Sequence, residues 1–455
     1  MMNIREIIDD IDSTKLYRLY TYLRNPEINY GVDKIVIDDV DVTRLLGRDE
    51  YISTDQLIKI SGLSIDVIEE TIPLIHSLQS IYSYDISVEE EFIDLLSTYI
   101  EEIYRWRSQI KKLYSEDSRK KNILLLIPSE KQFSNVRGNW RDWIWSEKTY
   151  TGVETPTFEG WINDILNLSE TLKSEGVNTI LAVDSDGADQ VMEVYKDDII
   201  QVDIPPNLPK IGYVRDQSLT WTREPIIGSM ALNIRRGEED IIIKVYREIG
   251  LNPIYKVGWE VLNNRVVMPY LEGGNFIVVD GDGYQVIFTG VGVRGSNHAT
   301  FKALSRILPS NIKIYGVPIS AYIRRWRDGA VHLDVVMMYL GELNGVKTLI
   351  LDPSRMSLYS FLEYIPETNM FKLRNGLTVF KELGIEIDEP PRESSSKVTM
   401  VNALNLGGGK ILVDRYNGDV NRYLRKYGVD IIEVDIPHIE AGGGGIRCAS
   451  KELWI

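Results

Sequence analysis

Residues 122–128 read NILLLIP, a short apolar run that ends in proline. Runs of the same kind recur further along, among them NFIVVD at 275–280, VKTLILD at 346–352 and GKILVD at 409–414. Segments with helical spacing lie between them, for example TFKALSRIL at 300–308. Strands that alternate with helices predict an α/β domain. The spacing also allows several similar units, each built as strand, strand, helix and strand.

The chain before this region has the pattern of helices. Apolar residues recur three and four positions apart from Phe92 to Tyr104, as on one face of a helix. The stretch LIKISGLSIDVIEE at 57–70 predicts a helix, a short turn and a second helix. Ser53 followed by Gln56 resembles a capping box at the start of the first of these helices.

Charge argues against nucleic acid as the partner of this helical part. Residues 1–120 hold 24 acidic and 14 basic residues, whereas a DNA-binding helix-turn-helix needs a basic surface. We therefore expect a small, mainly helical N-terminal domain over 1–120 that serves packing or oligomerisation. The polar stretch SEDSRKK at 115–121 predicts the linker to a second domain over 121–455.

Composition limits the partners and the compartment. The 455 residues carry a net charge of −16, which suits a cationic ligand better than nucleic acid or an anionic membrane. One cysteine cannot form a disulfide within the chain, which fits a reducing cytoplasm. The N terminus is polar and acidic, and no apolar run has the length of a membrane span. We expect a cytoplasmic protein.

The sequence predicts neither a cofactor nor a metal ion. GVGVRG at 290–295 matches a dinucleotide-binding glycine pattern, but that site also needs an acidic residue about 20 positions further on. No Asp or Glu occurs between Ser296 and Trp326. The chain has four histidines and one cysteine, and none forms a pair with zinc-ligand spacing.

Six stretches, taken together, point to a known family. In chain order they are YVRDQSLTW at 213–221, MALNIRRGEED at 230–240, YLEGGNF at 270–276, GVGVRG, HLDVVMMYL at 332–340 and GGGGIRCAS at 442–450. With this order and these residues, the chain from Asn122 to Ile455 resembles the guanidino-group-modifying superfamily, the penteins. It is most similar to arginine deiminases and related amidinotransferase-type proteins. The resemblance implies an α/β fold, a five-bladed propeller of ββαβ units around a polar channel.

The resemblance also implies a role for each polar residue of these stretches. Cys448 stands at the position of the nucleophile, and His332 at that of the general acid and base. Asp216 and Asp334 stand where two carboxylates clamp the guanidinium group. Glu272 stands where a carboxylate contacts both the guanidinium and the histidine. The glycines before Cys448 permit backbone angles closed to other residues and a close approach to the substrate.

The resemblance is weaker at the end of the site that would hold the amino-acid part of the substrate. Arg235 and Arg294 stand where arginine deiminases bind the substrate α-carboxylate. Lys210, however, stands where the family has an asparagine that helps to hold the amino acid. Gln217 and Asn275 also depart from the family's RDP or RDT and EGGD forms. These departures put free arginine in doubt as the substrate.

The chemistry explains why these residue types are needed. A guanidinium is planar, charged and rich in donors, so carboxylates bind it in pairs. Its carbon is a poor electrophile, which calls for a thiolate as nucleophile. We expect an arginine deiminase-like hydrolase that converts L-arginine and water to L-citrulline and ammonia through a covalent amidino-cysteine intermediate. The partners expected are a small cationic guanidino substrate and a second copy of the chain, bound through the N-terminal domain.

Three alternatives stay open. An amidinotransferase would pass the same covalent intermediate to an amine, and an arginine dihydrolase would release ornithine after the loss of both nitrogens. These enzymes differ in which bond breaks and what enters next, which the motif residues do not settle. The third alternative is a binding protein that senses guanidino compounds without turnover. The complete set of nucleophile, base and carboxylates argues against it.

Overall fold

The structure is a computed structural model that describes the greater part of the chain. Every structural statement below refers to the described residues alone. None of the helices in them is both long and apolar enough to cross a membrane. The described ranges are 11–24, 31–32, 36–37, 40–41, 50–82, 86–136, 156–195, 198–208, 210–281, 283–292, 295–319, 330–390 and 401–455.

Five sheets of the described chain follow one plan. Each begins with two antiparallel strands, and a later strand that follows a helix pairs in parallel with one of them. The first two units are β8 (Ser218–Leu219), β9 (Ile226–Ile227), α11 (Glu238–Ile249) and β10 (Tyr255–Lys256), then β13 (Phe276–Asp280), β14 (Gln285–Val291), α12 (His298–Ile307) and β15 (Ile312–Pro318). The next two are β16 (Met337–Leu343), β17 (Val346–Leu351), α13 (Gly376–Glu382) and β20 (Ile385–Asp388), then β21 (Leu404–Gly407), β22 (Lys410–Asp414), α14 (Gly418–Leu424) and β23 (Asp430–Val434).

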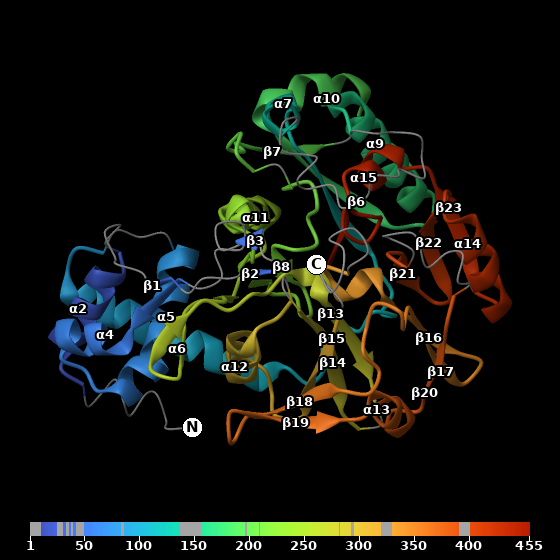
Figure 1. Cartoon of the computed structure of the whole chain (residues 1–455). Coiled ribbons are helices and arrows are strands. Elements are labelled where there is room, and N and C mark those ends of the chain that lie inside the picture. The colour runs from blue at the N-terminus through green and yellow to red at the C-terminus, as the bar shows by residue number, and fades with distance from the viewer. Residues whose placement is uncertain are drawn as a thin grey trace.

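The fifth sheet joins the two ends of the α/β part. The last strand, β24 (Lys451–Leu453), pairs with β5 (Asn122–Ile127), the first strand of this part. Parallel strands β6 (Asn178–Asp184) and β7 (Ile199–Val202) complete the sheet. Helices α7 (Glu130–Val136), α9 (Phe158–Ser174), α10 (Ala188–Val194) and α15 (Pro437–Ala441) lie near it, and the hairpin β18 (Phe361–Ile365) and β19 (Met370–Arg374) extends the sheet of β15. Figure 1 shows the five sheets around a common centre, with the C terminus near it.

The apolar run NILLLIP at 122–128 contains strand β5, which is buried on both faces of its sheet. Every side chain from Ile123 to Ile127 is fully buried in the structure. A continuous apolar run of this kind is typical of a strand with packed layers on both faces of its sheet. The prediction of an α/β fold is therefore confirmed.

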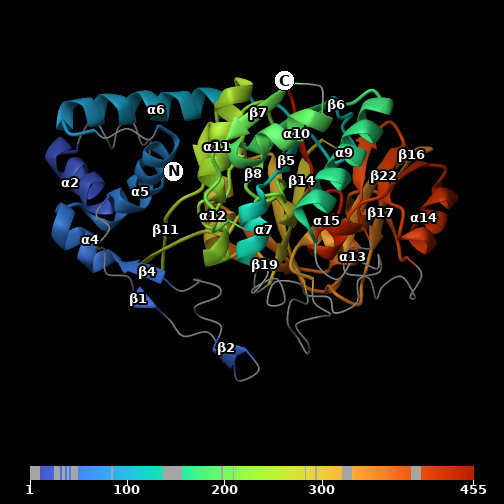
Figure 2. The same ribbon diagram turned by 90° about the horizontal axis from the view of Figure 1, so that it is seen from above.

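Helices predominate in the described part of the first 120 residues. They are α2 (Ser13–Leu23), α4 (Thr54–Ser61), α5 (Ile65–Tyr82) and α6 (Glu89–Gln109), with short strands β1 (Gly31–Val32), β2 (Val36–Ile37), β3 (Val40–Asp41) and β4 (Glu50–Ser53). Figure 2 shows these helices on one side of the α/β part. Strand β4 nevertheless pairs with β12 (Arg265–Val267), which pairs with β11 (Glu260–Leu262). One hydrophobic cluster runs from Leu16 to Tyr364 across both parts.

The helix-turn-helix prediction is confirmed in its geometry, since α4 and α5 follow one another. Gly62 ends α4 in the left-handed conformation at φ 72°, which suits glycine. The capping-box prediction is wrong. Ser53 is the N-cap residue but makes no side-chain cap bond, and Gln56 instead donates to the hydroxyl of Tyr22. Tertiary contact with α2 has replaced the local bond.

Candidate active site

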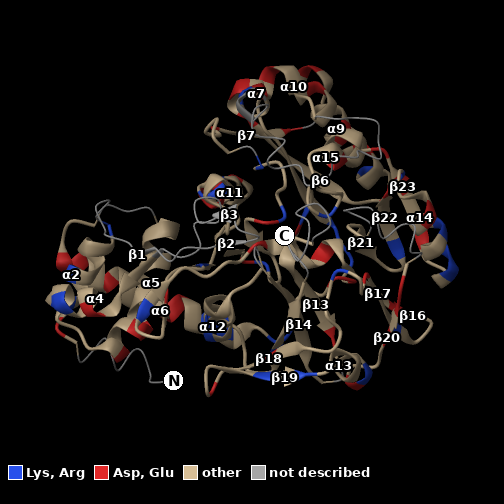
Figure 3. Cartoon of the chain, viewed as in Figure 1, with Lys and Arg blue, Asp and Glu red and all other residues tan. Residues whose placement is uncertain are grey.

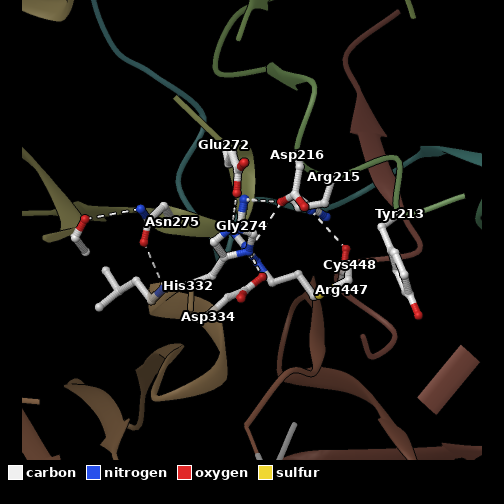
Figure 4. A network of polar contacts seen from close by, with 12 residues as sticks. Tyr213, Arg215, Asp216, Glu272, Gly274, Asn275, His332, Asp334, Arg447 and Cys448 are labelled. Carbon is white, nitrogen blue, oxygen red and sulfur yellow. Dashed lines mark hydrogen bonds and ion pairs between the residues drawn. The ribbon is translucent and has the colours of Figure 1, made fainter. Parts of the chain in front are cut away.

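Six polar residues gather at the centre of the α/β part from five separate places in the chain. Each stands shortly before one strand of the antiparallel pair in one of the five sheets, and each is at most 6% exposed. Figure 4 draws most of them at close range. The six are Asp216 before β8, Glu272 before β13, His332 and Asp334 before β16, Asn402 before β21 and Cys448 before β24.

The imidazole of His332 is held between two carboxylates. Its Nε2 hydrogen-bonds the Oε2 atom of Glu272, and its Nδ1 lies 3.6 Å from the Oδ1 atom of Asp216. The other oxygen of Glu272 accepts a hydrogen bond of 2.9 Å from the backbone N–H of Ala231, which fixes the carboxylate. Since an imidazolium donates from both nitrogens, both contacts suit its charged form.

Asp216 is the more strongly compensated of the two expected clamp carboxylates. Its Oδ1 accepts from the backbone N–H of Gly274 at 3.0 Å, and its Oδ2 accepts from Arg235 at 2.6 Å. Burial alone would raise the pKa of this carboxyl group. The positive charges of His332 and Arg235 outweigh burial, so the pKa of Asp216 lies below its usual value. Asp216 is therefore ionised at neutral pH.

Asp334 has one oxygen engaged and one without a partner. Arg447 donates to its Oδ2 atom at 2.9 Å, whereas its Oδ1 atom is buried with no hydrogen-bond partner among the described residues. Burial raises the pKa of Asp334, and Arg447 offsets part of that rise. A buried acceptor without a donor is uncommon in folded proteins, so this oxygen is open to a hydrogen bond from a water molecule or a ligand.

Arg447 links this carboxylate to the segment that joins the two parts of the chain. Its Nη2 atom donates to Glu116 at 2.9 Å and to the carbonyl of Phe276 at 2.9 Å. Arg447 is buried and directly precedes Cys448 in the chain. Glu116, which lies in the predicted linker, therefore helps to fix the residue beside the cysteine.

Cys448 is bound on two sides by a single amide. The side chain of Asn402 donates to the Sγ atom at 3.2 Å and accepts from the backbone N–H of Cys448 at 3.2 Å. Burial raises the pKa of the thiol well above its usual value, and the carboxylates of Asp334 and Asp216 raise it further. With its pKa raised in this way, the cysteine is a neutral thiol at pH 7.

The glycines before Cys448 allow close packing against side chains of the site. A Cβ atom on Gly445 would lie 2.7 Å from the amide oxygen of Asn402, and one on Gly444 would overlap the ring of Tyr213. Gly443 adopts φ 84°, a conformation that L side chains rarely take. The expected backbone conformation is confirmed at Gly443, and Asn402 and Tyr213 leave no room for a side chain at the next two glycines. The expected close approach to a substrate stays a prediction.

Of the two residues expected to bind a substrate carboxylate, the structure describes only Arg235. Arg294 lies outside the described residues. Arg235 is buried, and besides Asp216 it binds Glu238 through Nε at 3.0 Å and Nη2 at 2.7 Å. These carboxylates raise its pKa against the opposing effect of burial. Arg235 thus holds Asp216 in place, and its role toward a substrate carboxylate stays a prediction. Lys210 is buried and donates to the carbonyl of Gly442.

Two of the departures from the family pattern, Gln217 and Asn275, make structural hydrogen bonds in this chain. Gln217 donates to Glu238 at 2.6 Å, and Glu238 is the residue that holds Arg235. Asn275 donates to the carbonyl of Gly290 at 3.1 Å and accepts from the backbone N–H of Leu333 at 3.1 Å. These two amides brace the segments that carry Asp216 and His332.

Three of the site residues are spaced as ligands of a divalent cation would be. One ligand atom each of Asp216, Glu272 and His332 lies within 4.8 Å of the others. Both ring nitrogens of His332 already face these two carboxylates, so a metal would have to displace those contacts. That the protein needs no metal stays a prediction.

The sequence reasoning missed Asn402, Arg447 and Glu116. Asn402 had a detectable signal, because it stands shortly before an apolar strand run, as the other site residues do. Arg447 lies beside Cys448 in the quoted stretch, yet sequence order does not show that its side chain turns to Asp334. Glu116 comes from the predicted linker, where polar residues are usually solvated.

Comparison with known proteins supports the resemblance. Residues 385–454 match the family model of arginine deiminase. An arginine deiminase of Borrelia recurrentis is 22% identical over 261 residues, which cover 54% of this chain and 61% of that protein. An uncharacterised protein of Bacillus subtilis, YkgA, is 24% identical over 296 residues, which cover 64% of this chain and 87% of that protein.

The chain is similar to the arginine deiminases. This similarity confirms the resemblance based on the six stretches. The chain spans less than two thirds of the length of the arginine deiminases that it matches. Solved structures of similar shape include a dimethylarginine dimethylaminohydrolase adduct with S-methyl-L-thiocitrulline, at 18% identity and a TM-score of 0.48 over 73% of this chain and 100% of that chain. Another is the product-bound N-terminal domain of ArgZ, an arginine dihydrolase of cyanobacteria. It has 14% identity and a TM-score of 0.48, and the match covers 74% of this chain and 98% of that chain.

Proposed function

We propose that this protein is a hydrolase of a guanidino group that converts L-arginine and water to L-citrulline and ammonia. The observation that carries the proposal is the buried Oδ1 atom of Asp334, which lacks a donor beside a cysteine and a histidine. A guanidinium is rich in N–H donors and would satisfy that oxygen. We propose further that the five sheets are the blades of the expected propeller.

Substrate binding would also activate the nucleophile. In the proposal, Asp216 and Asp334 accept hydrogen bonds from the guanidinium, which brings a fixed positive charge to the carboxylates that now raise the pKa of Cys448. That charge lowers the thiol pKa, so the thiolate forms when the substrate is present. His332, in its charged form between Glu272 and Asp216, adds to the same effect.

The first half of the reaction forms the covalent intermediate. The sulfur of Cys448 attacks the guanidinium carbon, and a C–S bond forms as the carbon becomes tetrahedral. His332 gives a proton to one terminal nitrogen, the C–N bond breaks and ammonia leaves. An amidino-thioether on Cys448 remains, with the rest of the substrate still attached. Glu272 keeps the imidazole in place throughout.

The second half releases the product. His332, now neutral, takes a proton from a water molecule, whose oxygen attacks the amidino carbon. The C–S bond then breaks, the remaining hydroxyl proton passes to solvent as the oxygen becomes the ureido carbonyl of citrulline, and the thiolate of Cys448 returns. Asn402 donates to the sulfur and would stabilise the thiolate in both halves.

One observation favours a second candidate with a different guanidino substrate. Arg235 already pairs with Asp216 and Glu238, and Lys210 occupies the family's asparagine position. The end of the site that would hold an α-amino acid therefore lacks part of its expected set. A guanidino compound without the α-amino acid group, such as agmatine, would use the same Cys448, His332 and carboxylates.

Product analysis distinguishes these reactions. The pure protein is incubated with L-arginine, with and without glycine, and the products are identified by mass spectrometry. We expect citrulline and ammonia in equal amounts, independent of glycine. Ornithine without citrulline would indicate the dihydrolase reaction, and ornithine formed only with glycine would indicate amidino transfer. Turnover of agmatine alone would establish the second candidate.

The Cys448→Ala variant is the matched control. It removes the proposed nucleophile from a small, buried position, so we expect folding to be kept and turnover to be lost. Turnover at the wild-type rate in this variant would exclude the covalent mechanism. A wild-type protein that binds arginine but converts none of these substrates would instead support the sensor alternative.

A further inference from the structure

A cavity of about 540 Å³ lies at the junction of the helical and the α/β parts, away from the cysteine site. Its walls are the end of α6, the segment 110–114 and the turn at 222–224. Figure 2 shows α6 reaching from the N-terminal helices to the α/β part. The volume is in the range of small-molecule sites, and none of the six active-site residues lines it.

The walls of this cavity are basic in a strongly acidic protein. Lys111, Lys112 and Arg223 line it against a single carboxylate, that of Glu224. Lys112 forms an ion pair with Asp280 at 2.7 Å. Within the described chain, Lys111 and Arg223 have no ion-pair partner. Both side chains are exposed, so the cavity presents two cations to an anionic ligand, against the net charge of −16 of the whole chain.

Two aromatic side chains add a second feature to the same walls. Tyr114 is 44% exposed and stacks on Trp454 at a centroid distance of 3.8 Å, so its ring is held flat. Trp106 is 7% exposed, and its indole N–H is buried with no acceptor among the described residues. A ring that is stacked on a neighbour and partly exposed, as that of Tyr114 is, binds planar ligands by stacking.

We propose that this cavity binds a small anion that carries a planar ring, with the chemistry of a nucleoside monophosphate. The phosphate pairs with Arg223 and Lys111, as charge-assisted hydrogen bonds to phosphate require. The ring packs against Tyr114 and Trp106. These side chains are the cations without a described ion-pair partner and the aromatic residues among those that line the cavity.

The position of the cavity connects it to the cysteine site. The segment that forms its wall continues through Tyr114, whose N–H donates to the carbonyl of Trp221 at 2.8 Å, to Glu116. Glu116 holds Arg447 at 2.9 Å, and Arg447 precedes Cys448. A ligand that orders this wall would stabilise the arrangement of Arg447. This effect on turnover rests on the proposed function, whereas binding itself does not.

Calorimetric titration of the full-length protein with AMP tests the proposal. We expect saturable binding of AMP, with weaker binding of adenosine and of inorganic phosphate, each of which has only half of the recognised chemistry. The double variant Lys111→Glu with Arg223→Glu reverses both free cations, and we expect it to weaken AMP binding by about tenfold or more. Trp106→Phe keeps an aromatic ring, loses the indole N–H and should weaken AMP binding less.

The control is Lys372→Glu with Lys381→Glu, which reverses two exposed lysines on a distant hairpin and helix. It should leave AMP binding unchanged. Absence of saturable heat with AMP, or equal affinity in the two double variants, would overturn the proposal. Phosphate that binds as tightly as AMP would exclude the ring contact. Because the titration needs no turnover, inactivity toward arginine does not affect its outcome.

Discussion

At the scale of single residues, the protonation state of Cys448 is the property on which the proposed mechanism depends. Burial and the carboxylates of Asp334 and Asp216 hold its pKa well above the usual value. Arg447 acts in the opposite direction, but it does not reverse the shift. In the proposed mechanism, a thiol kept neutral in this way reacts only when the guanidinium cation enters the site, which limits side reactions of a lone thiol.

The rate of alkylation by iodoacetamide reports this directly. Below the thiol pKa the thiolate fraction rises about tenfold per pH unit, so we expect slow labelling at neutral pH and a steady increase with pH. Mass spectrometry is unambiguous here because the chain has one cysteine. The Cys448→Ala variant should stay unlabelled. Fast labelling that does not change between mildly acidic and mildly alkaline pH would contradict the raised pKa.

Asn402 is predicted to be a positioning residue for this thiol. Asn402→Ala removes the partner of both the Sγ atom and the backbone N–H of Cys448, which leaves a buried donor unpaired at a cost of about 1–3 kcal/mol. We expect kcat to fall by about tenfold or more, with a smaller change in KM, because the nucleophile loses its orientation. The measurement is steady-state kinetics with the substrate that the product analysis identifies.

Two further variants separate positioning from general destabilisation. Asn402→Asp places a carboxylate beside the sulfur, should raise the thiol pKa further and should slow alkylation at a given pH. Asn405→Ala removes a nearby buried amide that binds the carbonyls of Tyr339 and Leu340 instead. It should lower stability comparably and leave alkylation unchanged. An equal effect of both alanine variants on alkylation would reduce Asn402 to a structural role.

At the scale of elements, the site is built by repetition. Each of the five sheets places a short turn or 3-10 segment before its first strand, and each of these segments brings a polar residue to the centre. Loops at the ends of a rigid scaffold are where binding residues concentrate. The segment Gly273–Asn275 is the most crowded of them, because it lies between Asp216 and the His332 turn.

Gly274→Ala tests this crowding. An added Cβ atom would lie 2.8 Å from Nδ1 of His332, 2.9 Å from Oδ1 of Asp216 and 3.1 Å from Oδ2 of Asp334. Since all three groups are buried and bound, we expect kcat/KM to fall by about a hundredfold or more, with the fold kept. Gly418→Ala is the matched control, because nothing lies within 4 Å of its added Cβ. Activity near wild type in Gly274→Ala would mean that the segment can shift without loss.

The same repetition explains what the sequence could and could not provide. The apolar runs and the helices between them predict α/β units, because burial on both faces of a strand leaves a continuous apolar signature. The six stretches identify Cys448, His332 and the three carboxylates as one set. Asn402 went unrecognised, since a single asparagine has many structural uses. The pair of Ser53 and Gln56 misled in the opposite way, because Gln56 bonds Tyr22 of α2 and does not close a capping box.

At the scale of the whole molecule, the helical part is joined to the α/β part by more than a linker. Strand β4 pairs with β12, and the hydroxyl of Tyr99 on α6 donates to the carbonyl of Ile254 at 3.2 Å. The shared hydrophobic cluster places helix residues against the buried side chains of Tyr255 and Val257. Figure 3 shows acidic and basic residues spread over both parts. The boundary near residue 120 stays a prediction.

Removal of residues 1–109 tests whether that boundary separates independent domains. The truncated chain would expose Tyr255, Val257, Trp259 and their neighbours, and each buried apolar side chain contributes about 1.5–3 kcal/mol. A domain of net stability of about 5–15 kcal/mol cannot lose several such contributions and stay well folded. We expect the truncated protein to aggregate, or to show a much lower melting temperature when its unfolding is followed by circular dichroism, although it retains every residue of the candidate active site.

Ile72→Ala in the full-length chain is the milder form of this test, since Ile72 of α5 is fully buried in the shared cluster. We expect a loss of about 2–5 kcal/mol in the free energy of unfolding, in a single transition that includes the loss of activity. A soluble truncated chain with wild-type kcat and melting temperature would show instead that the α/β part folds alone. A separate early transition in Ile72→Ala would support the same conclusion, because the helices would then unfold without the sheets.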